Sequence, residues 1–457
     1  MSRFLRLGFR EALILFGGAL MVIAPALYSG FPLLYQDTGA YLATGYEGQI
    51  PLGRPVSYGW FIWGLAWGDS LWGAVLAQGL LLSYLIRRTL RVAVPGADNL
   101  RFFFLNLAVL TLFSGLGWYA GQLMPDIFAP ALLLVIFLIV FDENAHWGHR
   151  LGWTVLVWGL AFTHYSHVTM GLALVFLLAL GFTVELRRKK TGRTQLYRLG
   201  WVTGGIFAAV FSLFLVNQQN GFGWRMTRAS HVFLTGRVVA NGMLGAYLKE
   251  TCPDRDWRLC PYKDNLPYSA TNFIWNDNSP FKQTGYWFDS QEEYSAMLAD
   301  MIRRPKYLAW FALEGLEAGL QQVLHIRVGE GVAPYGANSS PWKFFERQMP
   351  EKLPLYQASR QAQGLDFTWI NAAQFLLFGG SVLALFFAFG PWKSHLNPEF
   401  FQLFAVLIMG YLLNAFLTAA LGNTYDRLQA RMVWQVILLG MLVVRQVYLV
   451  RKPKDDF

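Results

Sequence analysis

An aspartate stands just after the first long hydrophobic stretch of this sequence, in the run YQDTGAY at residues 35–41. Ionisable side chains are costly at a membrane, so a carboxylate placed there indicates a function by default. Such a carboxylate can act as a general base that takes a proton from a hydroxyl group. Aspartate is also a favoured first residue of a helix. We interpret Asp37 as the centre of an active site, with capping of an interfacial helix as the alternative.

Two further groups are expected at the same membrane face as Asp37. Asp126 follows Pro125 at the end of a hydrophobic span, and it is either a second catalytic acid or a helix cap. His164 and His167 stand three residues apart on the turn that leaves another span. This pair can bind a metal or a phosphate, or simply lie at the interface, and two ligands alone are weak support for a metal site.

Several arginines are candidates for binding an anionic substrate. Arg427 and Arg431 are four residues apart and therefore share one helix face. Together with Arg54 they are the basic residues of the short outer loops, where membrane proteins disfavour positive charge. Arg225 and Arg228 begin the longest polar segment. A guanidinium group matches the oxygens of a phosphate, and general attraction to anionic lipids is the alternative.

The composition predicts the kind of scaffold that positions these residues. Of the 457 residues 54% are hydrophobic and only 14% are charged, whereas soluble domains carry about 25% charged residues. The net charge is +10, but the basic residues lie between hydrophobic spans and form no surface typical of nucleic-acid binding. We therefore expect an all-α polytopic membrane protein with no nucleic-acid partner.

A helix that crosses a membrane takes about 20 mostly apolar residues, and about ten hydrophobic segments are candidates for such helices. They are residues 12–30, 71–86, 102–120, 127–141, 151–162, 168–184, 199–216, 369–389, 401–421 and 432–450. Because Lys and Arg favour cytoplasmic loops, the basic N-terminus and the run at 187–190 predict that both termini are cytoplasmic. The expected location is a bacterial inner membrane.

This pattern divides the chain into three parts. Residues 1–216 form an N-terminal transmembrane module whose first outer loop, 31–69, is expected to hold one or two helices at the membrane interface. Residues 217–367 form a mainly helical and loop-rich extracytoplasmic domain, and 368–457 form a C-terminal transmembrane module. The apolar residues at 305–326 recur at helical spacing, which predicts an amphipathic helix lying on the membrane.

The only two cysteines, Cys252 and Cys260, lie close together in the predicted outer domain. We expect them to form a disulfide, as in an oxidising compartment such as a bacterial periplasm, with two free thiols as the alternative. No phosphate-binding loop, dinucleotide fingerprint, zinc-protease motif or nucleophile elbow occurs. Nucleotide-driven pumps, dinucleotide enzymes and common hydrolases therefore lose their main support.

The layout resembles the GT-C superfamily of integral-membrane glycosyltransferases. Asp37 matches the essential acid that these enzymes carry in the loop after their first span, and Asp126 matches a second acidic position. The resemblance implies a polyprenyl-phosphate sugar donor, membrane lipids as surroundings, a general-base role for Asp37 and inversion at the sugar. The arginines and histidines named above would bind the leaving phosphate. Asp126 would orient the acceptor or help to hold a divalent metal ion, which is the one cofactor considered.

The sequence departs from known members of that superfamily. The paired acids of protein mannosyltransferases and the Trp-Trp-Asp-Tyr-Gly motif of oligosaccharyltransferases do not occur. The sugar, the acceptor and the use of a metal therefore stay open. Two alternatives also stay open: a transporter or flippase for a lipid-linked or anionic substrate, and a non-catalytic subunit of an envelope complex.

Overall fold

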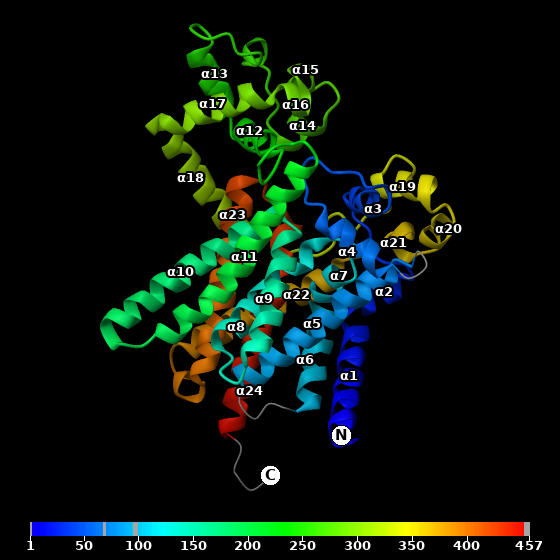
Figure 1. Ribbon diagram of the computed structural model, residues 1–457, viewed down its shortest axis with the longest axis vertical. Coiled ribbons are helices and arrows are strands. Elements are labelled where there is room, and N and C mark those ends of the chain that lie inside the picture. The colour runs from blue at the N-terminus through cyan, green and yellow to red at the C-terminus, as the bar shows by residue number, and fades with distance from the viewer. Residues whose placement is uncertain (1, 67–69, 95–98, 452–457) are drawn as a thin grey trace.

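The chain folds into a bundle of long helices covered at one end by shorter ones (Figure 1). The structure is a computed structural model that describes residues 2–66, 70–94 and 99–451. Within these residues the secondary structure is helical, apart from one isolated β-bridge. This confirms the predicted all-α class.

The bundle contains α1 (Ser2–Val22), α2 (Ala24–Ser29), α5 (Trp72–Ala93), α6 (Leu100–Phe113), α7 (Leu116–Ala120), α8 (Phe128–Phe141), α9 (Trp147–Phe162), α10 (Tyr165–Lys189), α11 (Arg193–Gln219), α22 (Thr368–Ala388), α23 (Pro398–Leu421) and α24 (Asp426–Arg451). The predicted interfacial loop forms two helices, α3 (Thr38–Glu47) and α4 (Ser57–Leu65). Residues 67–69 of that loop lie outside the described residues. Short 3-10 helices are η1 (Pro125–Ile127), η2 (Cys260–Tyr262) and η3 (Lys393–His395).

We call residues 220–367 the cap, and the end of the bundle that they cover the capped end. The cap contains α12 (Ser230–Ala240), α13 (Met243–Thr251), α14 (Ala270–Trp275), α15 (Pro280–Gln283), α16 (Tyr286–Asp289), α17 (Gln291–Arg303), α18 (Pro305–Gln322), α19 (Ser340–Gln348), α20 (Lys352–Gln357) and α21 (Arg360–Gln363). In Figure 1 the green part of the cap lies above the bundle, and the yellow part lies at the upper right beside α3.

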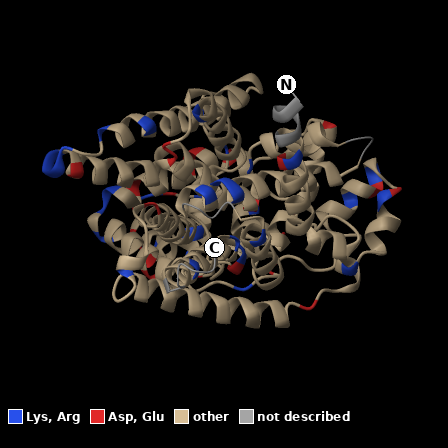
Figure 2. Cartoon of the chain, turned by 90° about the horizontal axis from the view of Figure 1, so that it is seen from below, with Lys and Arg blue, Asp and Glu red and all other residues tan. Residues whose placement is uncertain are grey.

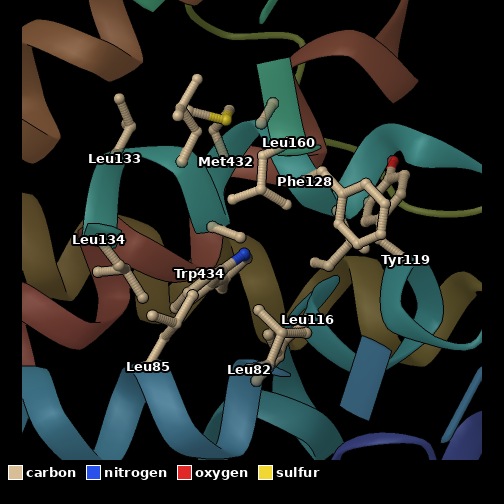
Figure 3. Close-up of a cluster of buried hydrophobic side chains, with 14 of the residues drawn as sticks. Leu82, Leu85, Leu116, Tyr119, Phe128, Leu133, Leu134, Leu160, Met432 and Trp434 are labelled. Carbon is tan, nitrogen blue, oxygen red and sulfur yellow. The ribbon is translucent and has the colours of Figure 1, made fainter. Parts of the chain in front are cut away.

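Helix α8 is the centre of the bundle. Every residue of α8 is buried, as expected of a helix that is hydrophobic on all sides. Trp434 of α24 lies fully buried in the cluster of apolar side chains around α8, with Leu82 and Leu85 close by (Figure 3). This packed centre fixes the ends of α5, α8 and α24 relative to one another.

Each of the ten predicted spans falls on a helix or a pair of helices, but not all have the character of a span. Among the described residues, five helices are long and apolar enough to cross a membrane: α10, α11, α22, α23 and α24. These five indicate a membrane protein. The predicted first span is divided between α1 and α2 just before Pro25, which cannot continue a helix ladder. The predicted third span is divided at Ser114, whose backbone is extended.

The charged residues mark the two ends of the bundle. Helix α1 begins and α24 ends at the end opposite the cap, and the turn between α10 and α11 projects to the lower left, away from the cap (Figure 1). The last turn of α10, just before this connection, contains Arg187, Arg188 and Lys189. Figure 2 looks onto this end, and the long helices are mostly tan between their coloured ends.

The cap is built in two parts. Buried residues between Ala229 and Tyr307 form a hydrophobic core of their own, separate from that of the bundle. Phe344, Phe345 and Tyr356 belong instead to the core of the bundle. Their rings meet the interfacial loop, since Phe31 lies edge-on to both Phe345 and Tyr356 at 5.9 Å. The predicted domain 217–367 therefore has one independent part, and a second part that packs onto residues 31–47.

Helix α18 has a protein neighbour, α23, on one face, and its position on a membrane surface stays a prediction. It packs along the end of α23, where a Cβ at Gly319 would come within 2.1 Å of the Phe416 ring. Gly315, one turn earlier, faces Ala420 in the same way. Small residues let two helices approach closely in membranes. The α18 leucines at 308, 313, 316 and 320 remain exposed.

Cys252 and Cys260 form the expected disulfide at the end of α13. The chain has no other cysteine, so a reductant acts on this bond alone. A closed loop with a sequence separation of 8 stabilises a fold by roughly 2–3 kcal/mol through the unfolded chain. We expect reduction, or Cys252→Ser with Cys260→Ser, to raise the rate at which a protease cleaves the cap. Equal protease resistance with and without reductant would contradict this.

Candidate active site

A short stretch of extended backbone holds the Asp37 loop against the loop that precedes Asp126. The amide of Leu33 donates to the carbonyl of Gly121 at 2.9 Å, and the amide of Leu123 donates back to Leu33 at 2.9 Å. The hydroxyl of Thr38 also donates to the carbonyl of Leu123 at 3.2 Å. Two loops that are far apart in the sequence are thereby fixed side by side at the capped end.

Asp37 directs its carboxylate to Arg54 and does not cap a helix through its side chain. It precedes α3, but its side chain makes no capping hydrogen bond. Instead Oδ1 of Asp37 lies 2.5 Å from Nη2 of Arg54, and both side chains are partly exposed. The guanidinium of Arg54 also lies over the Tyr41 ring, 5.7 Å from its centroid. The alternative that Asp37 is only a cap therefore loses its support.

The cap is held against the Asp37 loop by a side chain that bonds to the backbone of that loop. The side-chain amide of Gln361 accepts from the amide of Leu34 at 2.9 Å and donates to its carbonyl at 2.8 Å. Gly331 has a positive φ of 74°, and a Cβ there would fall 1.7 Å from the Tyr35 ring. A residue without a side chain is thus required where the cap meets the loop.

We expect Gly331→Ala to unfold at a lower temperature than the native protein. The left-handed backbone costs roughly 1–2 kcal/mol for a residue with a Cβ, and overpacking against Tyr35 adds roughly 1–3 kcal/mol. Gly336→Ala is a matched control, because a Cβ at Gly336 has no neighbour within 4 Å. Thermal unfolding in detergent measures both. Equal transition temperatures for the two variants would show that Tyr35 is not held as described.

Asp126 is buried between the two predicted arginines. Oδ1 of Asp126 lies 3.2 Å from Nη1 of Arg431 and 3.8 Å from Nε of Arg427. Asp126 is 3% exposed and Arg431 is 1% exposed. Arg431 also donates to Oδ1 of Asn414 at 3.0 Å. Asp126 lies inside the 3-10 helix η1 and makes no cap at its start, so it is the counter-ion of two buried cations.

Arg427 lies between Asp126 and the open space in front of Asp37. Its guanidinium lies over the Tyr35 ring, 4.1 Å from the centroid. Its Nε and Nη1 are buried and have no hydrogen-bond partner among the described residues. Burial raises the pKa of the Tyr35 phenol to about 12, so this ring remains neutral at physiological pH. Arg427 thus carries donors that an incoming anion can use.

A cavity of about 650 Å³ lies in front of these groups. Asp37, Arg54 and Arg427 line this cavity. The cap contributes a further wall that sequence reasoning did not select: Phe233, Thr271, Ile274 and Trp275. No local motif marks these residues. Trp275 is half exposed, and its ring is held 5.7 Å from that of Trp287.

Polar groups of α14 and of the loop before α24 meet at the cavity. The hydroxyl of Thr271 lies 2.8 Å from that of Tyr425, and the side-chain amide of Asn423 donates to the same tyrosine at 3.3 Å. Asn423 and Tyr425 line the cavity together with Ser340. Hydroxyl and amide groups beside an exposed indole ring suit a ligand that is both polar and flat-faced.

The two histidines have structural partners and do not line the cavity. His164 is the N-cap residue just before α10, and its Nδ1 accepts from the amide of Ser166 at 3.2 Å. Nδ1 of His167 lies 2.9 Å from the carbonyl of Leu160. His167 is buried and its Nε2 has no partner among the described residues. The centroids of the two rings lie 5.4 Å apart. Because His164 caps α10, a structural role explains it better than substrate binding does.

The two arginines of the polar segment also lie away from the cavity. Arg228 is buried, donates to the carbonyls of Ile50 and Pro51 at 3.0 Å, and stacks on Phe222. It therefore ties the cap to the interfacial loop. Arg225 is half-buried near the start of the cap and is not among the lining residues. Of the seven predicted substrate-binding residues, Arg54 and Arg427 line the cavity and Arg431 supports it from behind.

A divalent metal ion does not fit the two acids. Asp37 faces Arg54, and Asp126 faces Arg427 and Arg431, so a cation at either carboxylate would meet guanidinium groups. Within the residues that the structure describes, no three His, Cys, Asp or Glu side chains are grouped in a way that could hold a metal.

Comparison with protein-family models, with curated proteins and with solved structures finds no match for this chain. The function is therefore inferred from the cavity and its surroundings. Its features are a carboxylate with an arginine partner, a buried arginine with unpaired donors, and a polar and aromatic wall from the cap.

Proposed function

We propose that this protein is a membrane glycosyltransferase that moves a sugar from a polyprenyl-phosphate donor to an envelope glycan, lipid or protein. The observation that carries the proposal is the cavity in which Asp37 and two arginines, Arg54 and Arg427, face the aromatic wall of the cap. This transfer requires a carboxylate that takes up a proton and cations that bind a phosphate. They occur here in one cavity at one end of the bundle.

The proposed reaction is a single displacement. The carboxylate of Asp37 takes the proton from an acceptor hydroxyl as its oxygen attacks the anomeric carbon. The bond from that carbon to the phosphate oxygen breaks, and its electron pair stays on the lipid phosphate, which leaves as an anion. Attack from the side opposite the leaving group inverts the anomeric configuration. The products are the glycosylated acceptor and the free lipid phosphate.

The arginines supply the positive charge that the leaving phosphate needs. Fixed cations aimed at developing negative charge are a large source of catalysis in a site that excludes water. Arg427 lines the cavity, so an anionic oxygen that arrives there meets its guanidinium group. Arg54 holds Asp37 in the resting protein, and a phosphate competes for Arg54. Donor binding thereby frees the carboxylate for proton transfer.

The wall from the cap suits a sugar ring. The half-exposed Trp275 offers an indole face to the C–H groups of a sugar, and Trp287 beside it limits its movement. The hydroxyls of Thr271 and Tyr425 can exchange hydrogen bonds with sugar hydroxyls. A cavity of about 650 Å³ has the size of an ordinary small-molecule site, enough for a sugar with a phosphate.

The proposed setting is a bacterial inner membrane, with the capped end outside and both termini in the cytoplasm. The basic turn between α10 and α11 projects away from the cap, which agrees with the excess of Lys and Arg in cytoplasmic loops. The disulfide lies in the cap, where an oxidising compartment would maintain it. Ten crossings, five of them by the long apolar helices, are part of this proposal.

The proposal is tested in a strain from which the gene is deleted. Mass spectrometry of envelope glycans, lipids and proteins is expected to show the loss of one sugar modification, restored by the native gene on a plasmid. An unchanged set of modifications, with altered uptake or lipid distribution, would contradict the proposal. It would favour the transporter or flippase instead.

A further inference from the structure

A second and larger cavity lies on the other side of the first turn of α24. It has a volume of about 940 Å³. Asp426 lines it, whereas the next residue, Arg427, lines the candidate active site. The wall between the two cavities also contains the loop after α18, because the amide of Arg427 donates to Oε2 of Glu330 at 2.7 Å. The two cavities are thus neighbours.

This second cavity has one polar edge and one apolar wall. His325, Arg327 and Asp426 form the polar edge, and Phe375 and Phe378 of α22 belong to the apolar wall. Helix α22 is one of the five helices suited to cross a membrane. Phe375 is 66% exposed, so in a bilayer it faces the hydrocarbon chains. The cavity therefore joins an edge that holds the Arg327 guanidinium and the Asp426 carboxylate to the lipid region.

The polar edge is fixed to α22. The side-chain amide of Asn371 accepts from the amide of Val328 at 2.7 Å and donates to its carbonyl at 3.0 Å. The side-chain amide of Gln374 donates to the carbonyl of Ile326. These contacts hold the backbone on both sides of Arg327 against a membrane-spanning helix. The position of Arg327 at the cavity mouth is therefore set by the fold.

The charges at this edge leave one cation unpaired. Oδ1 of Asp426 accepts from the backbone amide of Arg327 at 3.2 Å and lies 3.8 Å from Nδ1 of His325. The side chain of Arg327 is exposed and makes no ion pair with any residue that the structure describes. An exposed guanidinium beside an apolar wall matches a phosphate that is attached to a hydrocarbon chain.

We propose that this cavity binds a lipid monophosphate from the surrounding bilayer, with its phosphate at Arg327 and its chain along Phe375 and Phe378. The inference goes beyond the transfer reaction, because it concerns a separate cavity whose occupancy is measured without turnover. A soluble phosphate would use the polar edge and leave the apolar wall unfilled. A neutral lipid would leave the guanidinium without an acceptor. A lipid phosphate places an acceptor at the polar edge and a hydrocarbon chain along the apolar wall.

The test uses the full chain in lipid nanodiscs and a prenyl monophosphate with a photoreactive group near the start of its chain. We expect cross-links to α22 around Phe375, and about tenfold weaker labelling in Arg327→Ala, because hydrogen bonds to charged groups are among the stronger ones. Arg327→Lys keeps the charge and is expected to retain most labelling. Arg303→Ala is the matched control, since Arg303 is an exposed cap arginine away from this cavity.

Three results would overturn the proposal. One is labelling of α22 that is the same in Arg327→Ala as in the native protein. Another is equal labelling by the corresponding prenyl alcohol, which has no phosphate. The third is complete displacement of the probe by millimolar inorganic phosphate, which would assign the cavity to a soluble anion. Labelling that persists in Asp37→Asn keeps this site distinct from the transfer reaction, whatever the fate of the proposed function.

Discussion

Asp37→Asn is expected to lower the yield of the transferred sugar by about 10²–10⁴-fold, the range that a general base contributes. Asparagine has nearly the same shape but cannot take the acceptor proton. The asparagine also lacks the negative charge that pairs with Arg54 at 2.5 Å, so Arg54 loses its ion-pair partner. Because the Asp37 side chain is partly exposed, the fold is expected to tolerate the change. The measurement is the amount of sugar-modified product in the deletion strain that carries the variant.

Glu47→Gln is the matched control for this result. Glu47 is the last residue of the same helix, α3, and also pairs with an arginine, Arg347, through a hydrogen bond of 2.7 Å. It is not among the residues that line the cavity. We expect Glu47→Gln to keep near-native yield. If Asp37→Asn also restored the full yield at native expression, Asp37 would be structural, and the transporter and subunit alternatives would move ahead.

Asp126→Asn is expected to lower both stability and activity. It leaves Arg427 and Arg431 without their shared counter-ion, and removing one partner of a buried ion pair costs roughly 3–5 kcal/mol. Arg431 is 1% exposed, so water cannot take over the role of the carboxylate. Arg427 is expected to shift as well, which misplaces a wall of the cavity. Thermal unfolding in detergent measures the first effect, and product yield measures the second.

The double variant Asp126→Asn with Arg431→Met separates these two effects. Replacing both members of a buried ion pair is often close to neutral, so part of the lost stability is expected to return. Activity is not expected to return, because the position of Arg427 still depends on Asp126. A single Asp126→Asn variant that unfolds at the native temperature would contradict the ion-pair geometry described here.

Part of the site could be predicted because successive membrane spans alternate in direction, which decides the face at which each span ends. Asp37, Asp126 and Arg427 are far apart in sequence, but each lies at a helix end that the alternation of spans directs to one face. Counting spans was enough to bring them together. The same reasoning also identified Arg54 and Arg431, and it missed that Asp37 pairs with Arg54, because a contact between two loop residues has no sequence pattern.

The errors arose where local chemistry competes with function. His164 looked like a ligand, but a side chain at the start of a helix also accepts backbone hydrogen bonds, as it does from Ser166. Arg228 looked like a phosphate contact, but it satisfies two carbonyls of the interfacial loop. The partners of Arg228 lie 177 and 178 residues away, beyond any local signal. Trp275 was missed because one aromatic residue in a polar segment is unremarkable.

The sequence predicted the all-α class of the fold, but not the surroundings of each helix or the positions at which helices are divided. Hydropathy located all ten apolar segments, since it reports burial in either lipid or protein. It does not separate these two surroundings: α8 is apolar because it is buried by other helices, whereas α22 has strongly exposed apolar residues. The division of the third segment at Ser114 escaped the sequence reading too, because the side chain that accepts from the amide of Gly115 belongs to Gln374, far along the chain.

The most direct test is to quantify polyprenyl-phosphate sugars by mass spectrometry in membranes of the deletion strain that carries either the native gene or Asp37→Asn. If the capped cavity consumes such a donor, one sugar-loaded lipid phosphate accumulates with Asp37→Asn and falls to its ordinary level with the native gene. If the amounts of all sugar-loaded lipid phosphates are the same in the two strains, the donor assignment is wrong, and the cavity serves another reaction.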